Sequence, residues 1–99
     1  MIQLVEIVEA PTYANVKDRF HVREVFVSPE HIVMIREDRN IARVLSESNA
    51  TIPGIDANMK YTKITINRGT TGQDIVVLGS SEMVYEKVYN SRSKQLLRG

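Results

Sequence analysis

Apolar and polar positions alternate with a period of two over much of this chain, which is the pattern of strands in a sheet. The first such segment is 2–8, where Val5 and Ile7 are the positions expected to be buried. The second begins at residue 19 and ends in the turn at 28–30. It has an apolar side, Phe20 and Val22, and a polar side, Arg19, His21 and Arg23.

The middle of the chain is less regular. His31–Glu37 is apolar at odd and even positions alike, which predicts a strand covered on both faces. We expect Ile41–Leu45 to form a short partner strand, reached through a turn at 38–40. Residues 46–60 follow neither period and contain Pro53-Gly54, so they predict an inserted surface loop.

The last third predicts a hairpin followed by a helix. Tyr61–Ile66 alternates cleanly and is expected to pair with Asp74–Leu78. Residues 79–81 offer an N-cap, Glu82 suits the first helical turn, and an apolar stripe follows: Val84, Tyr85 and Val88. These signals predict a helix over 81–91 and a basic tail over 92–99.

These elements predict a single domain over residues 1–99 that is mainly β with one C-terminal helix (α+β). We expect a small antiparallel sheet, SH3-like or partly closed like a barrel. A chain of 99 residues is long enough for one core.

Composition removes several classes of function. The net charge of +1, from 13 basic and 12 acidic residues, is too balanced for a strong nucleic-acid binder. The absence of cysteine excludes disulfides, a thiolate nucleophile and cysteine-ligated metals. No apolar run approaches the roughly 20 residues of a membrane span, and the N-terminus lacks a basic leader, so we expect a cytoplasmic protein without membrane insertion.

The segment NRGTTGQ, residues 67–73, has two interpretations. In the first it is a longer hairpin loop in which Gly69 and Gly72 supply positive φ angles. In the second its backbone N–H groups form a concave anion site. The candidate anion ligands are then Arg68, Thr70, Thr71 and Gly72, joined by Arg19 and Arg23 from the polar row. A P-loop is excluded, because a strand rather than a helix follows.

No pattern indicates catalysis. The carboxylates show no spacing that would pair a general acid with a general base, and His31 has no nucleophile in a recognisable setting. We therefore expect neither an enzyme nor a cofactor nor a metal site. Tyr85 and Tyr89, one helical turn apart, are expected to serve core and interface packing, with base stacking as the alternative.

Three segments resemble the FlbD-type family of flagellar and swarming-motility proteins and small phage proteins similar to it. They are VFVSPEHIVMI at 25–35, TKITINRG at 62–69 and IVVLGSSEMVYEKV at 75–88, within a family-like core of 22–91. The resemblance implies a small β-meander capped by a helix and a role in motility without catalytic residues. A viral accessory protein on the same scaffold is the other expectation that it raises.

Two functions follow from these observations. The first is a regulatory adaptor that binds another protein through a sheet edge or the helix face. The alternative is a phage-type module that sequesters a nucleotide signal or a short nucleic acid through its arginines. In both cases the small size and the apolar strands lead us to expect homo-oligomers.

Overall fold

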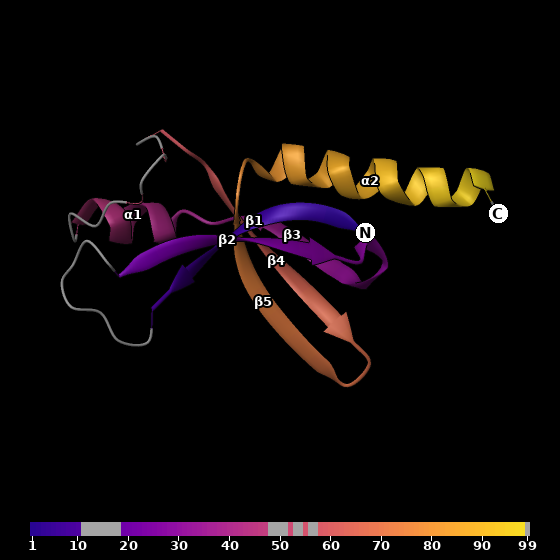
Figure 1. Ribbon diagram of the computed structural model, residues 1–99, viewed down its shortest axis with the longest axis horizontal. Helices are drawn as coiled ribbons and strands as arrows, with labels where there is room; N and C mark the ends of the chain where they lie inside the picture. The colour runs from indigo at the N-terminus through magenta and orange to yellow at the C-terminus, as the bar shows by residue number, and fades with distance from the viewer. Residues whose placement is uncertain (11–18, 48–51, 53–54, 56–57, 99) are drawn as a thin grey trace.

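The strands that the structure describes form one antiparallel sheet in the order β2-β1-β5-β4-β3 (Figure 1). The computed structural model describes residues 1–10, 19–47, 52, 55 and 58–98. The strands are β1 (Ile2–Glu9), β2 (Phe20–Val27), β3 (Ile32–Glu37), β4 (Tyr61–Arg68) and β5 (Thr71–Leu78). The predicted class, mainly β with a C-terminal helix, is confirmed.

The sheet is coiled because its two edge strands are consecutive in the chain. Only four residues, 28–31, separate β2 from β3, and three of them form the 3-10 turn η2 (Pro29–His31). The paired residues Glu6, Val77 and Thr62 mark one level across the sheet. Val27 lies four residue pairs from this level toward one end of the strands, and Ile32 lies four pairs from it toward the opposite end. A flat sheet would hold Val27 and Ile32 roughly 33 Å apart, whereas the connection reaches at most about 18 Å. The sheet therefore curls until its edges meet at this corner, although no ladder joins β2 to β3 and the sheet is not closed.

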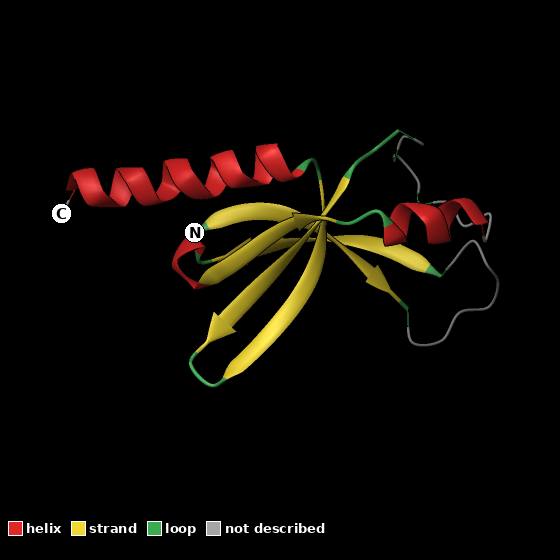
Figure 2. Ribbon diagram, turned by 180° about the vertical axis from the view of Figure 1, so that it is seen from behind, coloured by secondary structure: helices red, strands yellow, loops and turns green. Residues whose placement is uncertain are grey.

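Curling creates an inner face, which α2 (Ser81–Arg98) covers (Figures 1 and 2). The helix contacts β1, β3, β4 and η2. Val84 and Val88, 0% and 4% exposed, enter a core made of side chains from the inner face: Ile2, Leu4, Val27, Ile32, Ile64, Ile75 and Val77. The predicted cap is present, since Ser80 Oγ accepts a hydrogen bond from the N–H of Met83 at 3.2 Å.

The C-terminal helix is longer than the sequence pattern predicts. It continues to Arg98, so 92–98 belong to α2 and the prediction of a tail from residue 92 is wrong for them. The apolar stripe used to place the helix stops at Val88. The remaining residues have ordinary helix propensity and contain neither glycine nor proline before residue 99, so nothing in the chain ends the helix earlier.

A second core lies on the outer face, at the end of the sheet remote from α2. It contains Ile7, Phe20, Ile52 and Tyr61, against which α1 (Asn40–Glu47) packs. The prediction of a strand at Ile41–Leu45 is therefore wrong. Asp38 Oδ1 accepts hydrogen bonds from the N–H groups of Asn40 and Ile41 at 2.9 and 3.3 Å and starts the helix. The spacing of three and four residues among Ile41, Val44 and Leu45 is the helical signal.

The prediction that residues 46–60 form an inserted surface loop is wrong at its start and at Ile52. Ser46 and Glu47 end α1, and Ile52 is only 6% exposed, so that residue is part of the core and not of a surface excursion. Most of 48–57 lies outside the described residues.

β1 is an interior strand, between β2 and β5, and is covered on opposite faces at its two ends. Ile2 and Leu4 are buried under α2, and Ile7 is buried in the second core. Ile7 was expected to be buried, whereas Val5, the other predicted position, is only half-buried. The two helices cover opposite faces at opposite ends of the sheet (Figure 1). The buried positions of β1 therefore change from even-numbered to odd-numbered residues along the strand, and a single alternation could not predict them.

β3 is an edge strand, and the prediction that both its faces are covered is wrong. Val33 is 59% exposed and Met34 is 48% exposed. The register shifts between Ile32 and Met34, so Val33 occupies a β-bulge. Ile32 and Ile35 face the inner core, and the remaining apolar side chains of this strand face solvent.

Val84→Ala and Val88→Ala are each expected to lower the free energy of unfolding by about 1–3 kcal/mol, because each removes buried methyl groups from the core under α2. Denaturant titration measures the loss. Glu86→Ala, an exposed change on the same helix, is the matched control and should leave the midpoint within error of wild type. Unchanged midpoints for both valine variants would contradict this packing.

The pH dependence of stability at alkaline pH is expected to depend on Tyr61. Burial raises the pKa of the Tyr61 hydroxyl above its ordinary value of 10.0. As the pH rises past 10, the unfolded chain loses this proton before the folded chain does, so stability falls, by at most about 1.4 kcal/mol per pH unit. Tyr61→Phe should reduce that slope. Tyr85→Phe, on an exposed ring, is the control, and equal slopes for wild type and Tyr61→Phe would contradict the assignment.

Candidate functional site

The predicted anion loop is a tight hairpin between β4 and β5. Arg68 is opposite Thr71, so only Gly69 and Thr70 form the turn. Gly69 has φ +78°, as a two-residue hairpin turn requires. Gly72 lies inside β5 without positive φ, so the expectation of a longer loop shaped by both glycines is wrong.

The ligand candidates of this loop are exposed at its tip. Arg68, Thr70, Thr71 and Gly72 all face solvent, and Arg68 forms no ion pair with any residue that the structure describes. The hairpin projects away from both helices (Figure 2). Anion binding by these residues stays a prediction.

The two other candidates, Arg19 and Arg23, are already paired with carboxylates. Arg19 Nε donates to Glu9 Oε1 at 3.0 Å, and its guanidinium lies 5.0 Å from the centre of the Phe20 ring. Arg23 Nε donates to Glu6 Oε1 at 2.9 Å. The Glu6 side chain is only 10% exposed, so Arg23 neutralises a nearly buried charge.

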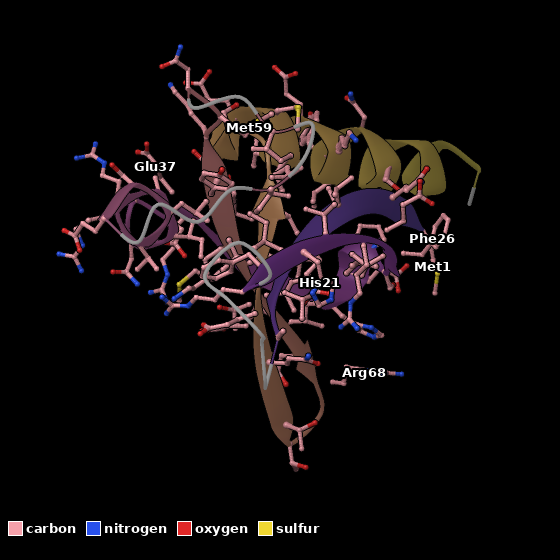
Figure 3. All side chains as sticks on the ribbon, turned by 60° about the vertical axis from the view of Figure 1, so that its left-hand side comes forward. Met1, His21, Phe26, Glu37, Met59 and Arg68 are labelled. Carbon is pink, nitrogen blue, oxygen red and sulfur yellow. The ribbon has the colours of Figure 1, made fainter. Side chains whose placement is uncertain are left out.

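The structure does not gather the six candidates into one site. Arg23 is level with Glu6 and Val77, and Thr71 lies six residues before Val77 on β5. That separation is roughly 20 Å along the strand. In Figure 3, Arg68 likewise lies apart from His21, which belongs to the same strand as Arg23.

A cationic pair that the sequence pattern did not reveal lies on the outer face. Arg36 and Lys63 are directly opposite each other on β3 and β4, an arrangement that is unfavourable for like charges. Asp74 Oδ2 lies 3.8 Å from Arg36 Nη2 and offsets part of the repulsion. Because cross-strand pairs follow from register, the linear sequence carried no direct signal for this pair.

Exposed apolar side chains gather on the two sheet edges and on α2. Phe26 on β2 is 63% exposed, and Val33 and Met34 on β3 are also exposed. On α2, Tyr85 and Tyr89 are 57% and 58% exposed, and their rings stack at 6.1 Å between centroids. The tyrosines therefore lie outside the core, and of the two packing roles predicted for them the interface role is the one that their exposure permits.

A cavity of about 310 Å³ lies between α2 and the start of β1. Its walls are mostly apolar and include Leu4, Met59, Leu78 and Met83. Lys87 at its rim donates to the backbone carbonyl of Gln3 at 3.3 Å. That bond joins the helix to β1, beside the buried stripe of Val84 and Val88 that turns this side of α2 toward the sheet.

The chain matches no protein-family model, no curated protein and no solved structure. Within the described residues, no three histidine or acidic side chains are grouped closely enough to hold a metal ion. No helix in the same part of the chain combines the length and apolar character needed to cross a membrane.

Arg23 and Arg68 are expected to respond differently to alanine substitution. Arg23→Ala leaves the Glu6 carboxylate unpaired and should cost about 1 kcal/mol of stability, whereas Arg68→Ala should leave stability unchanged. If an anion binds at the hairpin tip, Arg68→Ala should weaken it by roughly 1.5–3 kcal/mol, or tenfold to a hundredfold.

Thermal unfolding and calorimetric titration with mono-, di- and cyclic nucleotides measure these two effects on wild type and both variants. A ligand that binds wild type and Arg68→Ala equally would remove the hairpin tip as its site.

Proposed function

We propose that the protein is a small regulatory adaptor rather than an enzyme, and that it binds another protein through the exposed aromatic face of α2. The observation that carries this proposal is the stacked pair Tyr85 and Tyr89. Both rings are more than half exposed although each is large enough to contribute substantially to a core.

The orientation of α2 supports a defined docking face. At about 3.6 residues per turn, Lys87 lies on one flank of the buried Val84 and Val88 stripe, and the two tyrosines lie on the other. Lys87 reaches β1, and α2 also contacts β3 on the far side of the sheet. The tyrosines therefore face the β3 side, where Val33 adds exposed apolar surface.

Tyrosine suits such an interface for physical reasons. Its ring buries a large apolar area with few rotatable bonds, and its hydroxyl keeps a hydrogen-bonding partner in the free and the bound state. Two stacked rings restrict each other further, so less side-chain entropy is lost when a partner binds.

The nucleotide-binding alternative has one observation in its favour. Arg68 is exposed beside the hydroxyl groups of Thr70 and Thr71 at a projecting hairpin tip. It is the weaker candidate, because the other two arginines invoked for it are engaged by Glu6 and Glu9.

The adaptor proposal predicts that Tyr85→Ser combined with Tyr89→Ser abolishes capture of a partner, with at least tenfold weaker binding, since aromatic anchors contribute about 2 kcal/mol or more each. Quantitative mass spectrometry would compare proteins retained from an extract of the organism that encodes the chain. Tyr85→Phe with Tyr89→Phe keeps the rings and should retain the partner.

Identical retained proteins for wild type and the serine variant would contradict the aromatic docking face. A nucleotide released from denatured wild type, without any specifically retained protein, would favour the alternative.

A further inference from the structure

We propose that copies of this chain associate edge to edge, with β2 of one copy pairing antiparallel to β3 of the next. Each copy offers both edges, because neither β2 nor β3 has a second strand neighbour in the described part of the chain. The two edges approach each other at the corner formed by residues 28–31 and diverge away from it, so that Phe26 near the corner and Glu37 at the far end of β3 lie well apart in Figure 3. This proposal does not depend on the aromatic face of α2.

The faces of the two strands restrict the possible registers. Phe26 and Glu24 are opposite Gln3 and Val5, which places them on the outer face with Ile7. Met34 and Arg36 are opposite Thr65 and Lys63, on the same outer face. Directly opposed side chains must share a face, so a shift of one residue is excluded and registers differ by steps of two.

One register matches every opposed pair. It places Phe26 opposite Met34 and Val25 opposite Ile35, and it places Glu24 opposite Arg36 and Arg23 opposite Glu37. Two exposed apolar side chains meet, and both charged pairs are complementary. The ladder ends where the bulge at Val33 begins.

Neighbouring registers lose this match. A shift of two residues sets either Phe26 opposite Arg36 or Glu24 opposite Met34, and each leaves a charge against an apolar side chain. Two-fold pairing of β2 with itself is also unfavourable. If the two-fold axis passes at Arg23 or Glu24, that residue lies opposite its own copy and identical charges meet. If the axis passes at Val25, Phe26 lies opposite Glu24.

Three of the four charged groups are available for this pairing, and the fourth, Glu37, shares its carboxylate with Arg39 at 3.5 Å. Glu24 is exposed and forms no ion pair with another described residue. The Arg36 side chain is 54% exposed and its contact with Asp74 is long, at 3.8 Å. The Arg23 side chain is 60% exposed beyond its bond to Glu6, so its remaining N–H groups can reach a second carboxylate.

Head-to-tail pairing of this kind produces a closed ring or an open filament, because each junction joins two different surfaces. Every copy then uses both of its edges. This removes the aggregation hazard that two unpaired, partly apolar edges present in a monomer.

Sedimentation velocity of the full chain and of charge-reversed variants tests the proposal. Wild type should form multimers at high micromolar concentration. Glu24→Arg and Arg36→Glu should each weaken association at least about tenfold, since each replaces an attractive cross-strand pair by a repulsive one. Arg68→Glu, which makes the same charge change at the hairpin tip, and the tyrosine variant Tyr85→Ser with Tyr89→Ser should sediment like wild type.

The decisive measurement is a mixture of the two charge-reversed variants. In either variant alone, positions 24 and 36 carry like charges at every junction. When the two variants alternate, positions 24 and 36 carry opposite charges at every junction, whichever variant contributes β2. The mixture should therefore recover multimers, and circular dichroism confirms that both variants are folded. A monomeric wild type, multimers insensitive to both substitutions, or a mixture that stays monomeric while both variants are folded would each overturn the proposal.

Discussion

The short connection between β2 and β3 is the constraint on which the rest of the structure depends. Four residues join strands at opposite edges of a five-stranded sheet, a distance that they cannot cross unless the sheet coils. Pro29 is buried in the turn, and Val27 and Ile32 at its two ends enter the same core. The curl forms the inner face into which Val84 and Val88 pack, so the place of α2 follows from the turn.

The same constraint decides what stays exposed. The sheet coils without a ladder between its edges, so both edges retain unpaired backbone groups, and three apolar side chains on them stay exposed: Phe26, Val33 and Met34. β1, by contrast, lies between β2 and β5 and supplies Glu9 to Arg19, just before β2, and Glu6 to Arg23 on β2. β1 therefore supplies the counter-ions of Arg19 and Arg23, whereas Glu24 on β2 and Arg36 on β3 keep exposed charges at the sheet edges.

Much of the fold could be predicted from local signals, because hairpins, caps and period-two strands depend on neighbouring residues. The alternation around Arg19, His21 and Arg23, the pairing of β4 with β5 and the cap at Ser80 are of this kind. The predictions that were wrong concern features that depend on residues far apart in the chain. His31–Glu37 has the composition of a covered strand, and only the strand order shows that it is an edge.

The candidate site shows the same limit more strongly. A two-residue period identifies side chains on one face, but it cannot show whether a neighbouring strand supplies their counter-ions. The period therefore indicates Arg19 and Arg23 as ligands, whereas in the fold they form ion pairs with Glu9 and Glu6. Arg36 and Lys63 were overlooked because their opposition exists only after pairing. Register, which long-range packing sets, is the missing information in both cases.

The magnitudes of these interactions indicate how edge pairing would behave. Backbone hydrogen bonds contribute about 0.5–1.5 kcal/mol each, and a matched cross-strand pair adds roughly 0.2–1 kcal/mol. A four-residue ladder therefore yields only several kcal/mol, against an association cost of at least about 4 kcal/mol. A single junction is marginal. Closure into a ring makes the last junction intramolecular and so far more favourable, which is why an assembly built on such short edges is expected to be cooperative.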